Sequence, residues 1–248
     1  MGTEEIILIA AVAAVAALIK SVAGFGYPVL LVPVLSLFID FVDAVLIVAP
    51  SNFLLNLGMV WSLRDHRHDA LTLRTFCSFG VAGAIAGTLL LPWIPVDAAR
   101  VILFVLLVAF LVNRVSPLRV SLSDTSARRY APLVGAVSGV FQGATGIAGP
   151  VVTPWFLSLD RGRQVFVFSI TTVFGITGLA QIAVALLDGI FERSTIGVAM
   201  LLIPVSILAI PVGARIRERV SVETFEKFVL SLLTLSSLTL LARILGLT

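Results

Sequence analysis

Long apolar runs, separated by short polar segments, make up most of this chain. Six of these runs come close to the roughly 20 residues that a helix needs to cross a bilayer. We therefore expect six plain transmembrane helices, at residues 43–63, 72–91, 97–113, 165–187, 194–213 and 225–245.

Two other apolar segments, residues 4–38 and 130–159, are interrupted by glycine and proline. The first contains Gly-Phe-Gly-Tyr-Pro at 24–28, and the second contains Gly-Ile-Ala-Gly-Pro at 146–150. Segment 4–38 is too long for one span and short for two, whereas segment 130–159 should divide into short helical pieces around its glycines. We interpret both as hairpins that enter the membrane and turn back. One broken span at each site, or two full spans, are the alternatives.

The two breaks occupy matching places in the two halves of the chain. A shift of 122 residues (146 − 24) lays residues 20–37 on residues 142–159. The chain therefore resembles two diverged copies of one unit, and paired breaks of this kind indicate the substrate site of a secondary transporter. Six of the 18 aligned positions are identical: Gly24/Gly146, Pro28/Pro150, Val29/Val151, Leu35/Leu157, Ser36/Ser158 and Leu37/Leu159.

Composition assigns the chain to the polytopic membrane proteins. Hydrophobic residues make up 59% of it and charged residues 12%, and the mean hydropathy is +1.12. The first apolar stretch lacks a basic flank, so we interpret it as structure and not as a cleaved signal. Cys77 is the only cysteine, which excludes an intrachain disulfide and a cysteine-based metal cluster. The net charge of +3 comes from loops and does not indicate nucleic acid as a partner.

The placement of lysine and arginine predicts the orientation, because these residues collect on the cytoplasmic side. If both broken segments return to the side they entered, 13 of the 17 Lys and Arg residues lie inside and Lys20 lies in the membrane. A single broken span at each site would instead place residues 215–219, with their three arginines, outside. In the hairpin interpretation, by contrast, only three basic residues lie outside: Arg100, Arg193 and Arg243.

We therefore expect an all-α integral membrane protein built from two inverted repeats. Each repeat is a broken or re-entrant helical hairpin plus three transmembrane helices. Residues 1–113 form the first repeat, 114–130 a cytoplasmic linker, and 131–248 the second repeat. Both termini then lie outside the cytoplasmic (cell) membrane.

The breaks themselves suggest anion binding. Proline is favoured in the first turn of a helix, so Pro28 and Pro150 should open short helices inside the membrane. The unpaired N–H groups and the positive dipole end of such a helix point into the break, where a small anion is the natural ligand. The alternative is that the breaks are kinks that only permit close packing.

Lys20 adds a positive charge four residues before Gly24. A lysine near the bilayer centre costs about 2.5–3.5 kcal/mol on insertion scales, so it normally faces a cavity or a partner. The substrate would supply the counter-charge, although the side chain has the alternative of snorkelling to Asp40, Asp43 or lipid phosphate. The matching residue of the second copy is Gln142. One charge, two helix ends and polar side chains suit a tetrahedral or pyramidal oxyanion.

Other polar residues lie where they would face the same cavity. Asn52 and Asn56 share one helix face, and Thr171, Thr172 and Gln181 lie on the matching span of the second copy. Hydrogen bonding between neighbouring helices is the alternative role. The candidate substrate-binding residues are Lys20, Gly24, Phe25, Gly26, Tyr27, Pro28, Asn52, Asn56, Gln142, Gly143, Thr145, Gly146, Gly149, Pro150, Thr171 and Thr172.

Glycines also recur at helical spacing away from the breaks. Gly135, Gly139 and Gly143 form one smooth face, and Gly83 and Gly87 form another. Faces of this kind let two helices approach closely. We expect packing within the chain, with a homodimer contact as the alternative.

Several other functions are not supported by the residues. His66 and His68 lie in a basic loop without further ligands, so we expect no metal site and no cofactor. No apolar segment offers a Ser/His pair, so the chain is not expected to be an enzyme. The plain spans hold almost no acid, so in proton-coupled transport Lys20 or the substrate would carry the proton.

The two breaks and the hydrophobic length near 250 residues resemble the TauE/SafE family of sulfite exporters and related permeases. The family signatures fall on residues 24–28 and 143–150, with an asparagine segment at 52–56, and Ala148 departs from the glycine found at position 26. The resemblance implies a secondary transporter that exports sulfite or a small organosulfur anion, with the proton as candidate coupling ion and the lipid bilayer as surroundings. A passive anion channel is the alternative, followed by a non-transporting scaffold.

Overall fold

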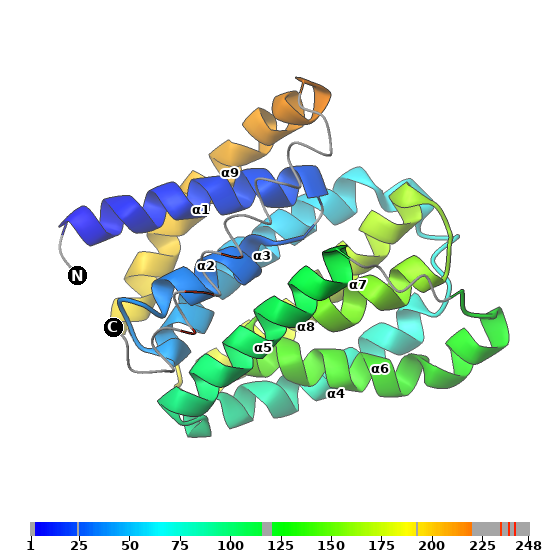
Figure 1. The fold of residues 1–248 in the computed structure, drawn as a ribbon, viewed down its shortest axis with the longest axis horizontal. Coiled ribbons are helices and arrows are strands. Elements are labelled where there is room, and N and C mark those ends of the chain that lie inside the picture. Colours follow the sequence, from blue (N-terminus) through cyan, green and yellow to red (C-terminus); the bar gives the residue numbers. More distant parts are fainter. Residues whose placement is uncertain are drawn as a thin grey trace.

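The computed structural model describes residues 3–23, 25–115, 121–191 and 193–219, together with residues 234, 238 and 241. Every element in this part of the chain is a helix, and the prediction of an all-helical protein is confirmed (Figure 1). The elements are α1 (Thr3–Ala23), α2 (Tyr27–Leu35), α3 (Phe41–Ser62), η1 (Arg64–His66), α4 (Leu73–Leu90), η2 (Leu91–Trp93), α5 (Val96–Val115), α6 (Asp124–Thr145), α7 (Gly149–Ser158), α8 (Arg163–Leu187) and α9 (Arg193–Arg219).

Three helical stretches of the described chain are long and apolar enough to cross a membrane. They are Phe41–Ser62, Leu73–Trp93 and Arg163–Leu187, and two shorter apolar helices are Ile9–Ser21 and Thr195–Leu208. Five of the six expected spans coincide with α3, α4, α5, α8 and α9. The sixth, at 225–245, lies outside the described residues except for positions 234, 238 and 241.

Each broken segment consists of a long helix followed by a short one. The long helices α1 and α6 have 21 and 22 residues, or about 30 Å at 1.5 Å per residue, while α2 and α7 have 9 and 10 residues. Each short helix packs back against the long helix before it. Segment 130–159 does divide at Gly146, but the expectation that both pieces are short is wrong, because α6 starts at Asp124, inside the expected linker, and continues unbroken to Thr145.

The helix bounds repeat at the same shift that aligns the two breaks. Adding 122 to the bounds of α1, α2 and α3 gives 125–145, 149–157 and 163–184, which nearly coincide with α6, α7 and α8. The same shift carries α4 to 195–212, within α9. Where both halves are described, they therefore have the same order of helices, and α1, α2 and α3 nearly match α6, α7 and α8 in length.

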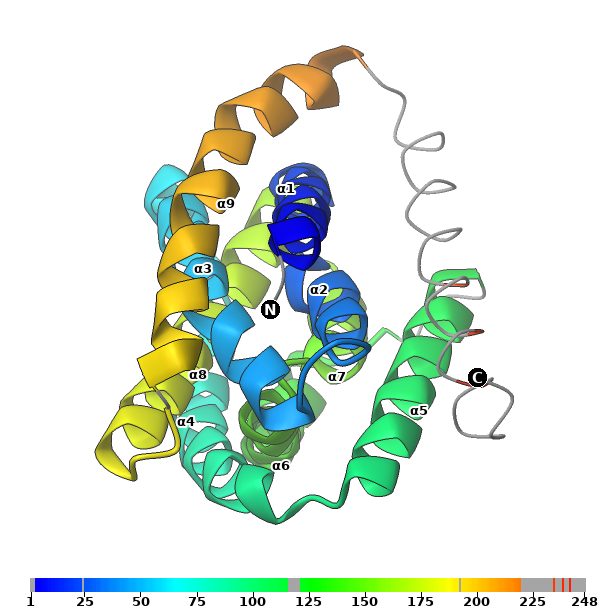
Figure 2. The same ribbon diagram turned by 90° about the vertical axis from the view of Figure 1, so that its left-hand side faces the viewer.

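The packing of these helices also follows the repeat. Helix α1 packs on α9, and its counterpart α6 packs on α4. Helix α3 packs on α9, its counterpart α8 packs on α4, and α3 and α8 pack on each other. The pair α1–α9 forms one side of the molecule and the pair α4–α6 the opposite side, with α2, α3, α7 and α8 between them (Figures 1 and 2).

Glycines bring α4 and α6 into backbone contact. A Cβ atom on Gly139 would overlap the carbonyl oxygen of Gly80, and one on Gly143 would overlap that of Ala84. The contacting positions rise together along both helices, so α4 and α6 run parallel. The expectation that the glycine faces pack within the chain is therefore correct, and this packing explains why these glycines do not break α6.

Candidate functional site

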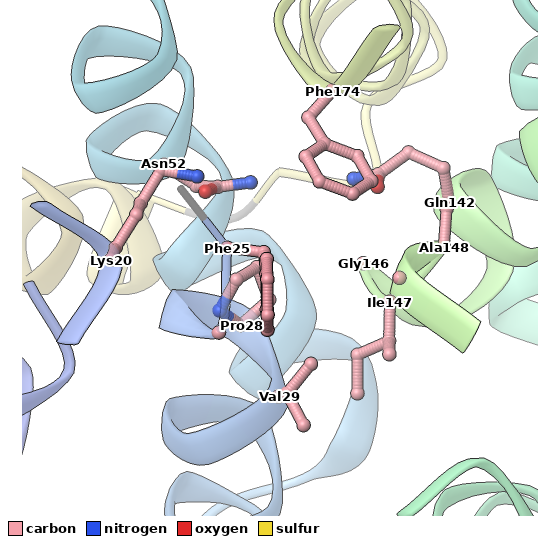
Figure 3. Close-up of a pocket in the computed structure, with 12 residues that line it drawn as sticks. Lys20, Phe25, Pro28, Val29, Asn52, Gln142, Gly146, Ile147, Ala148 and Phe174 are labelled. Carbon is pink, nitrogen blue, oxygen red and sulfur yellow. The ribbon is translucent and has the colours of Figure 1, made fainter. Parts of the chain in front are cut away.

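Both breaks line one small buried cavity between the two halves of the protein (Figure 3). The last turns of α1 and α6, the first turns of α2 and α7, and the middles of α3 and α8 all contribute to it. The lining residues are Lys20, Phe25, Gly26, Pro28, Val29, Asn52, Gln142, Gly146, Ile147, Ala148, Gly149 and Phe174.

The first break turns at Gly26, which has a positive φ of 108° and caps the N-terminus of α2. Glycine adopts this angle readily because it has no Cβ atom. Helical bonding begins with the N–H group of Leu30, which donates to the carbonyl of Gly26 at 3.1 Å. The earlier N–H groups of α2 have no partner within the helix, and its first turn, at Pro28 and Val29, lines the cavity.

The second break turns at Gly146, which has a φ of 70° and ends α6. Its N–H group donates to the carbonyl of Gln142 at 2.8 Å. The next residue, Ile147, donates its N–H group to Thr145 Oγ1 at 3.1 Å. Thr145 therefore shapes the backbone of the break and does not line the cavity. Gly149, the first residue of α7, does line it.

Lys20 is buried at the cavity, with 1% of its surface exposed. Its Nζ atom lies 5.7 Å from the centroid of the Phe174 ring, a cation–π contact. Within the described residues no carboxylate forms an ion pair with it. Asp43 accepts a hydrogen bond from Thr195 instead, at 2.7 Å. The ammonium group is thus turned inward, away from the surface to which a snorkelling lysine would extend.

Two amide side chains face the same space from opposite halves. Asn52 is 3% exposed, and its Oδ1 atom has no hydrogen-bond partner. The side chain of Lys20 points toward this amide (Figure 3). On the other side, Gln142 donates from Nε2 to Gln181 Oε1 at 3.4 Å, and Gln181 Nε2 donates to the carbonyl of Gly143 at 3.0 Å. Gln181 therefore lies behind Gln142 and orients it.

Most of the lining consists of equivalent positions in the two halves. The shift of 122 residues pairs Lys20 with Gln142, Asn52 with Phe174, Phe25 with Ile147, and Gly26 with Ala148, and all eight line the cavity. Applying the shift to Asn52 would have found Phe174 in the sequence, and applying it to Phe25 and Gly26 would have found Ile147 and Ala148. Val29 was one of the six identical positions of the two breaks, but its equivalent Val151 does not line the cavity, so identity between the copies did not by itself identify lining residues.

Eight of the candidate residues line the cavity, Gly24 lies outside the described residues, and the others lie behind the lining. The Tyr27 hydroxyl shares a hydrogen bond with Ser206 at 2.7 Å, and both polar side-chain atoms of Asn56 are buried without a partner beside Gly175. Hydroxyl groups on α8 donate to carbonyls one turn earlier in the helix. The residues absent from the lining are Tyr27, Asn56, Gly143, Thr145, Pro150, Thr171 and Thr172.

The cavity is closed around a very small space. Its volume is about 10 Å³, which is near the minimum that holds one water molecule. Among the described residues, its polar groups are one ammonium, two amides, the N-terminal ends of α2 and α7 and the C-terminal ends of α1 and α6, and no acidic side chain lines it. This chemistry favours an anion over a cation, and the anion enters only when the lining side chains move apart. In the described part of the chain, no group of three or more His, Cys, Asp and Glu residues is arranged to hold a metal ion.

Comparison with known proteins gives one match. The family model described as Sulfite exporter TauE/SafE matches residues 9–240, a range that contains both breaks and every residue that lines the cavity. No curated protein and no solved structure matches the chain.

Proposed function

We propose that this chain, which belongs to the TauE/SafE sulfite exporter family, is a secondary transporter of a small sulfur oxyanion, sulfite or an organosulfonate. The observation that carries the proposal is the meeting, in a single cavity, of two short-helix N-termini and a lysine that has no ion-pair partner among the described residues. We place the transporter in the cytoplasmic membrane and the direction of transport outward.

The unpaired polar groups support an anionic substrate. A buried lysine without a counter-ion is costly in a membrane, by about 2.5–3.5 kcal/mol on insertion scales, and an anion beside Lys20 removes that cost. The Oδ1 atom of Asn52 needs a donor as well. An oxyanion that retains one proton satisfies both groups, since its oxygens accept from the ammonium and its proton is donated to the amide. Such a substrate would itself carry the coupling proton.

The small size of the cavity favours a carrier over a channel. A channel needs a continuous path, whereas a carrier encloses its substrate and opens to one side at a time. The main lining side chains, Lys20, Phe25, Asn52, Gln142 and Phe174, are all at most 7% exposed. A closed site between two equivalent halves is the arrangement that alternating access requires.

The packing of α3 and α8 supports inverted repeats, with residues 1–113 and 131–248 as the two units joined through 114–130. The hydrogen bond between Asp43 and Thr195 holds the start of α3 against the start of α9, and a short turn joins α9 to the end of α8. Further along α3, Asn56 lies beside Gly175 in the middle of α8. These contacts run in opposite directions along α3 and α8, as expected of equivalent helices related by a two-fold axis in the membrane plane.

Site-directed labelling tests this arrangement. Single cysteines at positions 40 and 162, which are equivalent under the shift, are introduced into a Cys77→Ala background. A membrane-impermeant maleimide applied to intact cells should label position 40, and position 162 should be labelled only after the cells are opened. Labelling of both positions from the same side would contradict the inverted arrangement.

Flux measurements in proteoliposomes test the transport function. The purified protein should take up radiolabelled sulfite with saturation, and internal unlabelled sulfite should accelerate uptake by exchange. Flux that does not saturate and shows no exchange would favour the channel, and no flux above protein-free vesicles would favour the scaffold. Taurine serves as the selectivity control, because it is zwitterionic and should compete poorly at a site built on one positive charge.

A further inference from the structure

Phe174 occupies a special place in the cavity. It is the equivalent of Asn52 under the shift of 122 residues, so one wall of the site offers an amide where the opposite wall offers a phenyl ring. The ring stands between the Lys20 and Asn52 side and the Gln142 side (Figure 3). It is 6% exposed, so its closest surroundings are the site itself and neighbouring helices.

The ring lies against the charge that the substrate would seek. Its centroid is 5.7 Å from Lys20 Nζ, and within the described residues this ammonium group has no ion-pair partner beside it. The negative face of an aromatic ring attracts a cation, and the attraction grows when both are removed from water. With only about 10 Å³ free, an anion can approach Nζ only if lining side chains move, and the Phe174 ring is the lining side chain in cation–π contact with Nζ.

We propose that Phe174 is a specificity-determining residue of the anion site. Its ring fills the space beside Lys20 and limits the size of the anion that can take the place of the ring next to the ammonium group. The inference rests on the proposed anion transport. While the site is empty, the ring shields the ammonium group, and when a small oxyanion binds, charge pairing replaces the weaker cation–π contact. A substituent on sulfur larger than an oxygen collides with the displaced ring.

The test compares two probes that differ in size, sulfite and sulfoacetate, in proteoliposomes containing the full chain. The Phe174→Ala variant should raise uptake of sulfoacetate relative to sulfite by about tenfold or more, which corresponds to a modest change in binding free energy. The Phe174→Tyr variant keeps the ring and should keep the ratio of the wild type. The Phe174→Trp variant has a larger ring and should reduce uptake of sulfoacetate further.

Phe168→Ala is the matched control. Phe168 lies on the same helix and is also 6% exposed, but it does not line the cavity. Its truncation removes the same atoms and should leave the ratio unchanged, which separates loss of packing from widening of the site. Monodisperse elution in detergent confirms that each variant is folded.

The outcomes distinguish this inference from the function on which it rests. If the wild type takes up neither anion, the proposed transport is wrong. If the wild type transports sulfite and Phe174→Ala leaves the ratio within about twofold of the wild type, the role of Phe174 is wrong while the transport stands. A change of ratio in Phe168→Ala as large as that in Phe174→Ala would also overturn the inference.

Discussion

The chain contains the same helix–helix interface twice, and the two copies are packed differently. In the α4–α6 copy, glycines at 135, 139 and 143 bring backbones into contact. In the α1–α9 copy, the equivalent positions of α1 are Ala13, Ala17 and Ser21, each of which carries the Cβ atom that glycine lacks. In the closely packed α4–α6 pair, the uncharged Gln142 lies near the end of α6. In the more loosely packed α1–α9 pair, Lys20 lies at the equivalent place in α1. The helix that carries the charge is therefore the one less tightly held to its neighbour.

This difference suggests how the two halves divide their roles. Interdigitated backbones such as those of α4 and α6 resist sliding, because every glycine contact is lost at once when one helix shifts. A helix pair separated by methyl groups tolerates small shifts more easily. We expect the α4–α6 pair to act as the fixed body and the α1–α9 pair to move when the cavity opens.

Substitution in the α4–α6 interface should cause the largest loss of stability. The Gly139→Ala variant places a Cβ atom on the Gly80 carbonyl, and overpacking of this kind costs at least about 1–3 kcal/mol, with more where the backbone must move. We expect little folded protein, measured as the monodisperse fraction and melting temperature in detergent. The Ala17→Gly variant, at the equivalent position of α1, should lose only about 1 kcal/mol. Equal losses would contradict the difference between the two interfaces.

The sequence predicted the helices and the repeat well, because both depend on local patterns. Runs of apolar residues gave the positions of α3, α4, α5, α8 and the start of α9 to within a few residues, and the shift between the two breaks carries the bounds of α1, α2 and α3 close to those of α6, α7 and α8. The sequence could not assign roles within that frame. Gly143 and Gly146 are both glycines of α6 or its cap, yet one packs on α4 and the other lines the cavity.

Apolar lining residues were the hardest to predict. In a soluble protein a polar face identifies the surface, but in a membrane helix apolar residues face lipid, neighbouring helices and cavities alike. Phe174 and Phe168 are alike in residue type and in apolar surroundings, and only the shift that pairs Phe174 with Asn52 and Phe168 with Leu46 separates the one that lines the site. The threonines of α8 were misleading for a related reason, since a hydroxyl in a membrane helix is satisfied by its own backbone.

At the cavity, the two halves differ most at the equivalent residues Lys20 and Gln142, of which only Lys20 is charged. Removing one partner of a buried ionic contact costs roughly 2–5 kcal/mol, so Lys20→Ala should weaken binding of sulfite by about 30-fold or more. Lys20→Arg keeps the charge and should retain part of the affinity. Gln142→Ala removes a neutral hydrogen bond of about 1 kcal/mol and should weaken binding only severalfold. Calorimetry or competition in detergent measures all three variants, and unchanged affinity in Lys20→Ala would refute the charge pairing.

Exchanging the two residues tests whether the halves are equivalent in function as well as in position. The double variant Lys20→Gln with Gln142→Lys moves the charge to the other wall of the same cavity. The short amide of Gln142, which donates to Gln181 Oε1, is replaced by a longer lysine side chain that is not held in the same place, so we expect affinity about tenfold below the wild type but clearly above that of Lys20→Gln alone. If the double variant binds no better than Lys20→Gln, the position of the charge matters and the two walls are not interchangeable.

The smallest effects on stability should come from glycine and alanine substitutions in the two breaks, where the backbone angles of the two halves also differ. Gly146 has φ 70° and ψ 1°, close to the left-handed region that other residues enter at about 1–2 kcal/mol, and a Cβ atom there would meet Val45 and Val32 at ordinary contact distances of 3.6 and 3.8 Å. Gly26 has φ 108°, farther from that region, and its Cβ atom would crowd Ile19 at 3.2 Å.

Gly26→Ala should therefore lower the melting temperature more than Gly146→Ala, and Ala148→Gly should change it least, because Ala148 already has a negative φ of −103°. Adding Ile19→Ala to Gly26→Ala separates the two causes. If crowding dominates, this truncation recovers part of the loss caused by the added methyl group, measured against Ile19→Ala alone, whereas a loss that persists in full comes from the backbone angle. Equal losses of melting temperature at positions 26 and 146 would mean that the two breaks respond alike to an added side chain despite their different turns. The asymmetry of the site would then come from its side chains alone.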